Sequence, residues 1–196
     1  MSDFNISQIK ADAMAHKIPT IRSGSEQILL SWAKETNPLT ILEFGTAVGV
    51  SAINLALATK ARVITIEKDT ERVEQAKINI EKAGLKSRIE VILGDDSVVA
   101  KCLVNAKRKF DFVFLDSAKG QYCRLLPMII ELLNTNGVLV ADNVLFRGYV
   151  YGDCPRRFKT IAKNLRLFID SCKNSNCFKD VQIIDVEDGL LVAKKV

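Results

Sequence analysis

The chain has 196 residues, of which 48% are hydrophobic and 26% are charged, an ordinary balance for a globular protein. This length suits one α/β domain with a full core, so we expect residues 1–196 to form a single domain. No apolar run approaches the ~18 residues that a membrane helix needs, and the first residues lack the apolar core of a secretory signal. We therefore expect a cytoplasmic protein without a membrane-spanning segment.

The net charge of +5 is mildly basic, which is compatible with a nucleic-acid partner but does not require one. The cysteines are odd in number and irregularly spaced, and none forms a C-x-x-C pair: Cys102, Cys123, Cys154, Cys172 and Cys177. Such a pattern is typical of free thiols in the cytosol.

Apolar runs and helical periodicity alternate along the chain. The expected helices cover residues 2–16, 23–34, 50–59, 70–83, 96–105, 121–133 and 158–172. The expected strands cover residues 39–44, 62–66, 89–93, 110–115 and 137–141, and a closing hairpin pairs residues 181–184 with 190–193 across Asp188-Gly189. Pro127 is expected either to kink its helix or to begin a second segment.

Strands that are nearly continuous apolar runs, alternating with helices, predict an α/β fold whose parallel sheet is covered on both faces. Ligands of such sheets bind at the carboxyl ends of the strands. The residues directly after each strand are therefore the candidates for a functional site.

The first strand is followed by a glycine turn, E-F-G-T-A-V-G at residues 43–49. Gly45 and Gly49 permit a tight turn and a close approach to a ligand, and the next helix offers amide donors to an anionic group. Ala47 holds the middle position, so this is not the dinucleotide fingerprint G-x-G-x-x-G. Glu67 follows about 20 residues later, where an acid suits a ribose diol. Each feature alone could be a plain turn or a helix cap, but together they favour a nucleoside ligand.

Acids also follow the later strands. Asp95 and Asp96 come after the third strand, Asp116 after the fourth, and Asp142-Asn143 after the fifth. One such acid is usually a helix cap, but polar endings after five consecutive strands are hard to explain by capping alone.

Asp116, Asp142 and Asn143 predict a divalent-cation site, because the fourth and fifth strands should be neighbours in the sheet. Carboxylate and amide oxygens are ligands that Mg²⁺ prefers, and substrate oxygens could fill its remaining positions. The alternative to a metal site is that Asp116 and Asp142 are two unrelated helix caps and that Asn143 lies in a turn. Lys119, three residues after Asp116, is a candidate base or orienting group for a substrate hydroxyl, or else a surface lysine paired with Asp116.

The chain resembles the cation-dependent class I O-methyltransferases, the group that contains catechol and caffeoyl-CoA O-methyltransferases. The resemblance runs from about Ile18 to the C-terminus, on I-L-E-F-G-T-A-V-G-V-S (41–51), T-I-E (65–67), F-D-F-V-F-L-D-S-A-K (110–119), A-D-N-V-L (141–145) and D-G-L (188–190). It implies a Rossmann-like methyltransferase fold: a seven-stranded, mostly parallel sheet with an antiparallel C-terminal hairpin strand and helices on both faces. It also implies a homodimer, with helices of residues 1–36 covering the cofactor site.

The same resemblance implies S-adenosylmethionine as cofactor and a role for each motif residue. The methionine part would contact Glu43, Gly45, Thr46 and Ser51. The ribose would bind Glu67, and the adenine would lie near Asp95 and Asp96. Asp116, Asp142 and Asn143 would hold Mg²⁺ or another divalent cation, with Asp116 also near the cofactor and Lys119 beside the reacting oxygen.

Two segments are similar to bacterial tRNA methyltransferases that methylate 5-hydroxyuridine at the wobble position: S-A-K-G-Q-Y (117–122) and D-N-V-L-F-R-G (142–148). In 5-hydroxyuracil, as in a catechol, two neighbouring oxygens can chelate one Mg²⁺, which lowers the pKa of the hydroxyl. This resemblance implies transfer of a methyl group to the 5-hydroxyl, giving 5-methoxyuridine.

A basic loop follows the proposed metal motif and contains Arg147, Arg156, Arg157 and Lys159. These side chains could grip phosphates of a tRNA anticodon loop, while Tyr149 and Tyr151 could stack on bases. An ordinary polar loop before a basic helix start is an equal alternative.

Two other functions remain open. An apolar, aromatic-walled pocket would favour small catechols or related phenols, and Trp32, Phe146 and Tyr149 could build one. A nucleotide-binding protein without catalysis is disfavoured, because the D-x-x-K and D-N motifs are both intact. Ser117 departs from the family, whose members often carry an acid, alanine or histidine there.

Overall fold

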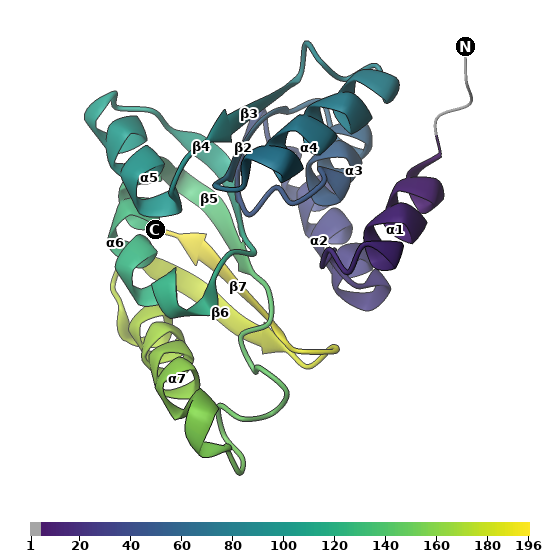
Figure 1. Cartoon of the computed structure of the whole chain (residues 1–196). Coiled ribbons are helices and arrows are strands. Elements are labelled where there is room, and N and C mark those ends of the chain that lie inside the picture. The colour runs from purple at the N-terminus through teal and green to yellow at the C-terminus, as the bar shows by residue number, and fades with distance from the viewer. Residues whose placement is uncertain (1–4) are drawn as a thin grey trace.

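The computed structural model describes residues 5–196, and its centre is a seven-stranded sheet with the order β3-β2-β1-β4-β5-β7-β6 (Figure 1). The strands are β1 (Thr40–Phe44), β2 (Arg62–Glu67), β3 (Ile89–Leu93), β4 (Phe110–Leu115), β5 (Leu133–Ala141), β6 (Phe178–Ile184) and β7 (Leu190–Lys195). Strands β1 to β5 run parallel, and β7 is antiparallel to β5 and β6. The predicted fold class is confirmed, as is the pairing of the fourth and fifth strands.

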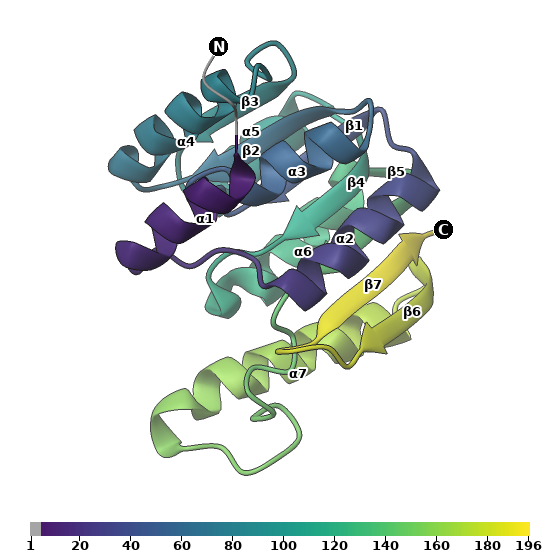
Figure 2. The same cartoon turned by 90° about the vertical axis from the view of Figure 1, so that its right-hand side faces the viewer.

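Helices cover both faces of the sheet (Figures 1 and 2). They are α1 (Ile6–Ala15), α2 (Ser23–Thr36), α3 (Val50–Ala58), α4 (Thr70–Lys82), α5 (Asp96–Asn105), α6 (Tyr122–Leu132) and α7 (Lys159–Asn174). The core on one face draws on α1 to α4, and that on the other on α5 to α7. Residues 2–4 of the first expected helix lie outside the described residues. Within residues 5–196, no helix has the length and apolar character needed to cross a membrane.

The segment from 119 to 141 differs most from the expected elements. A short 3₁₀ turn, η1 (Lys119–Gln121), precedes α6, and Leu133 begins β5 instead of ending the helix, because it pairs with Phe110 of β4. The expected strand start at Gly137 was therefore wrong by four residues. Pro127 lies inside α6 and starts no second segment; its position is exposed, where water can satisfy the carbonyl that proline leaves without a donor.

The central strand β4 is buried on both faces. Phe112 and Phe114 pack into the core beneath α1 to α4, whereas Val113 and Leu115 pack into the opposite core. All four side chains have no exposed surface. A strand covered on both sides needs apolar residues at every position, which explains the continuous apolar run in the sequence.

The register of the central strands aligns their carboxyl ends. Phe44 of β1 pairs with Ile66 of β2 and with Leu115 of β4, and Leu115 pairs with Ala141 of β5. The residues that follow these positions are therefore brought to one edge of the sheet: Gly45, Glu67, Asp116 and Asp142.

The hairpin between β6 and β7 holds the start of α2, which lacks a side-chain cap of its own at Arg22. The Glu187 carboxylate accepts hydrogen bonds from the Gly24 and Ser25 amides, both at 3.1 Å, and from the Ser25 hydroxyl at 2.8 Å. Arg22 pairs with Asp188 at 3.1 Å. These contacts attach the N-terminal segment to the C-terminal hairpin beside the end of β5.

Gly45 allows β1 and β4 to approach each other at this edge. Its φ is +100°, and a Cβ there would overlap the backbone carbonyl of Asp116. We expect Gly45→Ala to lower the free energy of unfolding by at least about 2 kcal/mol, through the clash and the left-handed backbone. Urea unfolding measures the change. Gly120→Ala is the matched control, because its Cβ would meet nothing within 4 Å. Equal stability of the two variants would contradict this role for Gly45.

Candidate active site

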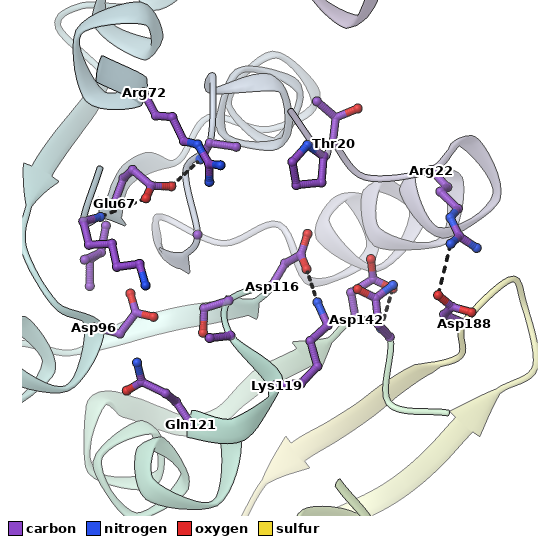
Figure 3. Close-up of a pocket in the computed structure, with 18 residues that line it drawn as sticks. Thr20, Arg22, Glu67, Arg72, Asp96, Asp116, Lys119, Gln121, Asp142 and Asp188 are labelled. Atoms are coloured by element: carbon purple, nitrogen blue, oxygen red, sulfur yellow. Dashed lines mark hydrogen bonds and ion pairs between the residues drawn. The ribbon is translucent and has the colours of Figure 1, made fainter. Parts of the chain in front are cut away.

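A pocket of about 390 Å³ opens at the carboxyl edge of the sheet (Figure 3). Seven of the predicted site residues line it: Gly45, Glu67, Asp96, Asp116, Lys119, Asp142 and Asn143. Glu67 and Asp96 lie toward one end, Asp116 and Lys119 in the middle, and Asp142 toward the other end (Figure 3). The structure therefore brings two of the predicted nucleoside-binding residues, Glu67 and Asp96, into one cavity with the three predicted metal-binding residues.

The glycine turn between β1 and α3 is held by hydrogen bonds from two other elements. The Ala47 amide donates to Glu67 Oε2 at 2.9 Å, and Asn79 of α4 donates to the Val48 carbonyl at 2.9 Å. Glu67 Oε1 accepts from the amides of Lys68 and Asp69 at 2.9 and 3.1 Å. Glu67 thus fixes the turn as well as lining the pocket.

Glu43, Thr46 and Ser51 lie beneath the turn and are not among the residues that line the pocket. Thr65 donates to Glu43 Oε2 at 2.5 Å, and the hydroxyls of Thr46 and Thr65 are 2.6 Å apart. Burial raises the pKa of Glu43 from 4.5 to about 7, against the lowering effect of the Ser51 and Thr65 hydroxyls. Through these hydrogen bonds, the buried residues can hold the conformation of the glycine turn.

The two acids after β3 have different surroundings. Asp95 caps α5: its carboxylate accepts from the Ser97 amide at 2.9 Å and from the Ser97 hydroxyl at 2.5 Å. Asp96 lines the pocket instead, and burial raises its pKa to about 6. The helix-cap interpretation therefore describes Asp95, and Asp96 is the acid available to a ligand.

Two acids from neighbouring strands meet in the pocket with one ammonium group. Lys119 Nζ lies 3.1 Å from Asp116 Oδ1, and the backbone amide of Asn143 donates to Asp142 Oδ1 at 2.7 Å. Burial raises the pKa of Asp116, and burial together with the charge of Asp116 raises that of Asp142 to about 6. This end of the pocket is therefore short of positive charge.

Tyr122 stabilises the backbone beside Asp116 and Asp142. It is fully buried, and its hydroxyl lies 3.1 Å from the Leu115 carbonyl and 3.0 Å from the Asp142 carbonyl. The side chain therefore ties the ends of β4 and β5 together, directly beside Asp116 and Asp142. Nothing in the sequence pattern predicted this role for Tyr122; its place in the segment S-A-K-G-Q-Y was the available signal.

Other lining residues were also missed: Pro19, Thr20, Arg22, Arg72, Gln121 and Asp188. The first three belong to the linker between α1 and α2 and to neither helix. Asp188 was expected only as part of the hairpin turn and of D-G-L, and the structure shows that it connects the hairpin with two other segments. Its carboxylate pairs with Arg22 and accepts from the Arg147 backbone amide at 3.2 Å, and its carbonyl accepts from the Leu145 amide at 2.8 Å.

The basic loop between β5 and α7 lies outside the pocket lining: none of Arg147, Tyr149, Arg156 and Arg157 is among the lining residues. Tyr149 stacks on Phe158, with Phe146 edge-on to both, and the Arg157 guanidinium lies 4.6 Å from the centre of the Phe158 ring. The loop projects beside the start of α7 (Figures 1 and 2).

Trp32 does not join the aromatic residues of this loop. It packs against the core beneath α1 to α4, whereas Phe146 packs against the core on the opposite face of the sheet. The suggestion that Trp32, Phe146 and Tyr149 wall one pocket was therefore wrong, because the sheet separates them.

The buried Glu43 predicts a pH-dependent stability. Its folded pKa of about 7 exceeds the ordinary 4.5, so its contribution is fully present below pH 4.5 and is lost as the pH rises through 7. Relative to Glu43→Gln, we expect the wild type to lose about 2–3 kcal/mol of unfolding free energy between about pH 5 and pH 8. Urea unfolding at the two pH values measures this difference.

Glu187→Gln serves as the control. Burial raises the pKa of Glu187, but hydrogen bonds from Ser25 and Gly24 outweigh it and hold that pKa below its usual value of 4.5. Its stabilising effect is therefore lost only at lower pH, so no pH-dependent difference from the wild type is expected between about pH 5 and pH 8. A Glu43→Gln variant that follows the wild type across this range would contradict the prediction.

Three known proteins illustrate the similarity. The catechol O-methyltransferase of Mycobacterium tuberculosis is 30% identical over 143 residues, which cover 71% of this chain and 64% of that protein. An O-methyltransferase from Bacillus cereus in complex with SAH superposes with a TM-score of 0.90 at 23% identity, over 100% of this chain and 92% of that one. TomG from Streptomyces achromogenes, an O-methyltransferase in complex with SAM, gives 0.85 at 23% identity, over 100% and 91%.

The first curated relatives are longer than the matching region, which spans 53%, 64% and 51% of their own length. At the level of the family the match is nearly complete, because residues 5–196 match the O-methyltransferase family. The chain belongs to the O-methyltransferase family.

Proposed function

We propose that the protein is a Mg²⁺-dependent, S-adenosylmethionine-dependent O-methyltransferase that converts wobble 5-hydroxyuridine of tRNA to 5-methoxyuridine. One observation carries the catalytic part of this proposal: Asp116, Asp142 and Lys119 line the same pocket as Gly45 and Glu67. A nucleoside cofactor and a chelated hydroxyl would therefore share one cavity.

S-adenosylmethionine, when bound, would supply the methyl group on its sulfonium. Glu67 would hold the ribose. Gly45, whose missing Cβ leaves room for the Asp116 carbonyl, would keep the turn beside Asp116, where the cofactor is proposed to bind. Thr46 and Ser51, together with Glu43, would support the methionine part from beneath the turn. Asp96 would face the adenine end, while Asp95 orders the start of α5.

The residues at the other end fit a divalent cation. Asp142 is a buried carboxylate and Asp116 a partly buried one, both have raised pKa values, and among residues 5–196 only Lys119 forms an ion pair with either. Asn143 adds a carbonyl oxygen, so the donor set is oxygen only, as Mg²⁺ prefers. No group of three or more His, Cys, Asp and Glu side chains that could hold a metal occurs in the described chain, so the proposal depends on Asn143 and on substrate oxygens.

Mg²⁺, when bound, would lower the pKa of the substrate hydroxyl. The chain itself supplies position and electrostatics. Lys119 would orient the reacting oxygen, since its ammonium is held at 3.1 Å from Asp116 and is largely shielded from solvent. Tyr122 would keep the two acids at a fixed separation. Such preorganisation is the main contribution that a protein makes to a transfer of this kind.

The tRNA part of the proposal is supported by the position of the basic loop. Arg147, Arg156 and Arg157 lie outside the pocket lining, so they can serve a substrate that extends beyond the pocket. Tyr151 is 59% exposed and could stack on a base. The net charge of +5 suits a polyanionic partner.

A small catechol-type phenol is the second candidate. The names of curated relatives favour it, among them the catechol O-methyltransferase of Mycobacterium tuberculosis. The rings of Phe146, Tyr149 and Phe158 also pack on one another. Tyr149 therefore already stacks on a ring of the protein itself, which makes it less available to stack on an RNA base.

We further propose a homodimer that works in the cytoplasm. The dimer rests on the family resemblance. The compartment is supported by the cysteines, all of which are free thiols in the structure, as a reducing environment would keep them.

Removal of the cation tests the metal. We expect EDTA to abolish transfer of label from S-adenosylmethionine and added Mg²⁺ to restore it. Asp142→Ala should lower the rate at least roughly a hundredfold, because it removes a direct ligand. Asp170→Ala, at an exposed acid on α7, is the matched control and should retain the wild-type rate. Transfer of label that continues in the presence of EDTA would rule out the metal mechanism for any substrate.

The substrate is tested by offering tRNA that contains 5-hydroxyuridine beside a simple catechol. We expect efficient methylation of the tRNA, and Arg156→Ala/Arg157→Ala should lower kcat/KM for it by roughly tenfold or more, through lost phosphate contacts. The same variant should leave catechol methylation unchanged. Lys82→Ala/Lys101→Ala removes the same charge from exposed positions on α4 and α5 and controls for net charge. Label in the catechol alone would replace the tRNA proposal with the second candidate.

A further inference from the structure

Arg22 lies at the rim of the pocket, at the end opposite the residues proposed to bind the nucleoside. It is the last residue of the linker between α1 and α2, and it lines the pocket together with Asp142 and Asp188. Figure 3 shows Arg22 and Asp188 beyond Asp142, on the side away from Glu67 and Asp96. A cofactor bound as proposed leaves this end to the acceptor, so Arg22 is a cation on the acceptor side of the pocket.

The guanidinium of Arg22 is only partly used by the protein. Its Nη2 donates to Asp188 Oδ2 at 3.1 Å, and within residues 5–196 its side chain makes no other hydrogen bond. The Arg22 side chain is 56% exposed, whereas that of Asp188 is 15% exposed and also accepts from the Arg147 backbone amide. Asp188 is therefore fixed and can orient the guanidinium, while Nε and Nη1 remain available as donors.

The acids near Arg22 do not use these remaining donors. Asp188 contacts Nη2 alone. Glu187 is the other nearby acid, and its carboxylate already accepts from the Gly24 and Ser25 amides and from the Ser25 hydroxyl. An oxyanion that enters this end of the pocket would therefore meet a guanidinium that still has donors to offer.

Space beside Arg22 continues past the rim of the pocket. A second hollow, of about 440 Å³, shares Pro19, Thr20 and Arg22 with the pocket, and Met14 and Lys17 line it further out. An acceptor that is longer than the pocket can therefore pass Arg22 and enter this hollow. The position of Arg22 between the two spaces suits recognition of a group that lies next to the reacting part of the acceptor.

We propose that Arg22 binds an oxyanion carried by the acceptor, so that the protein prefers an anionic acceptor to its neutral counterpart. The oxyanion is the phosphate of a nucleotide, as in tRNA, or the carboxylate of a phenolic acid. Both groups present a pair of oxygens that matches the planar fork of a guanidinium. This inference rests on the proposed O-methyl transfer and gives the chemical class of its acceptor.

Two matched pairs of acceptors test the proposal: 5-hydroxyuridine with its 5′-monophosphate, and catechol with 3,4-dihydroxybenzoate. Transfer of label from S-adenosylmethionine gives kcat/KM for each acceptor and for tRNA that contains 5-hydroxyuridine. In at least one pair, we expect Arg22→Gln to lower the ratio of anionic to neutral kcat/KM by roughly tenfold. The intrinsic reactivity of each acceptor is the same for every variant, so a changed ratio reports on the protein. The pair that responds identifies the source of the oxyanion.

Three further variants separate anion binding from a structural role of the ion pair. Arg22→Lys keeps the charge without the fork and should keep part of the ratio. Arg124→Gln removes the same charge from an exposed position of α6 and should keep all of it. Asp188→Asn removes the competing carboxylate but retains an acceptor for the Arg147 amide, so its ratio should be at least that of the wild type.

Unfolding curves establish that each variant is folded before the ratios are compared. Arg22→Gln with the wild-type ratio in both pairs would overturn the inference, as would an Asp188→Asn ratio that falls as far as that of Arg22→Gln. Label in tRNA but in neither anionic small acceptor would overturn the inference and leave the proposed function standing. No label in any acceptor, tRNA included, would overturn the proposed function and this inference with it.

Discussion

The site depends on one constraint, the parallel register that ends β1, β2, β4 and β5 on the same edge. Backbone hydrogen bonds pair Phe44, Ile66, Leu115 and Ala141 across adjacent strands, so the residues that follow them emerge together. Gly45 makes this possible at the tightest point, where any Cβ would meet the Asp116 carbonyl. A shift of one residue in any of these pairings would turn an acid away from the pocket.

The same edge concentrates carboxylates that are poorly solvated. Burial is the main cause of the raised pKa of Glu43, Asp96, Asp116 and Asp142 alike. Such acids cost folding free energy unless cations offset them. The ligands proposed here carry that charge: a sulfonium and an ammonium on the cofactor, and a divalent cation beside the acceptor. The folding free energy lost by burying these acids would then be offset when the cationic ligands bind.

Both ends of the chain contribute to the rim of the pocket. The linker with Arg22 comes from the N-terminal region, and Asp188 from the last hairpin, and their ion pair closes one side. Asp188 also holds the loop that carries Asn143 and Arg147, because its carboxylate accepts from the Arg147 backbone amide and its carbonyl from the Leu145 amide. The pocket is thus a product of contacts between segments up to 166 residues apart.

Local chemistry in the sequence determined much of this protein. The apolar runs predicted the strands, and the polar residues after them predicted the edge that carries the site. Gly45, Glu67, Asp116 and Asp142 all line the pocket.

Long-range pairing between segments decided the rest. Leu133 joined β5 because Phe110 lies beside it, and Asp95 became a cap while its neighbour Asp96 entered the pocket. Arg22, Gln121 and Asp188 reach the site from a linker, a turn and a hairpin, where no periodicity fixes the direction of a side chain. Trp32 and Phe146, both aromatic and both plausible in one wall, were separated by the sheet, because only packing determines which face a residue covers.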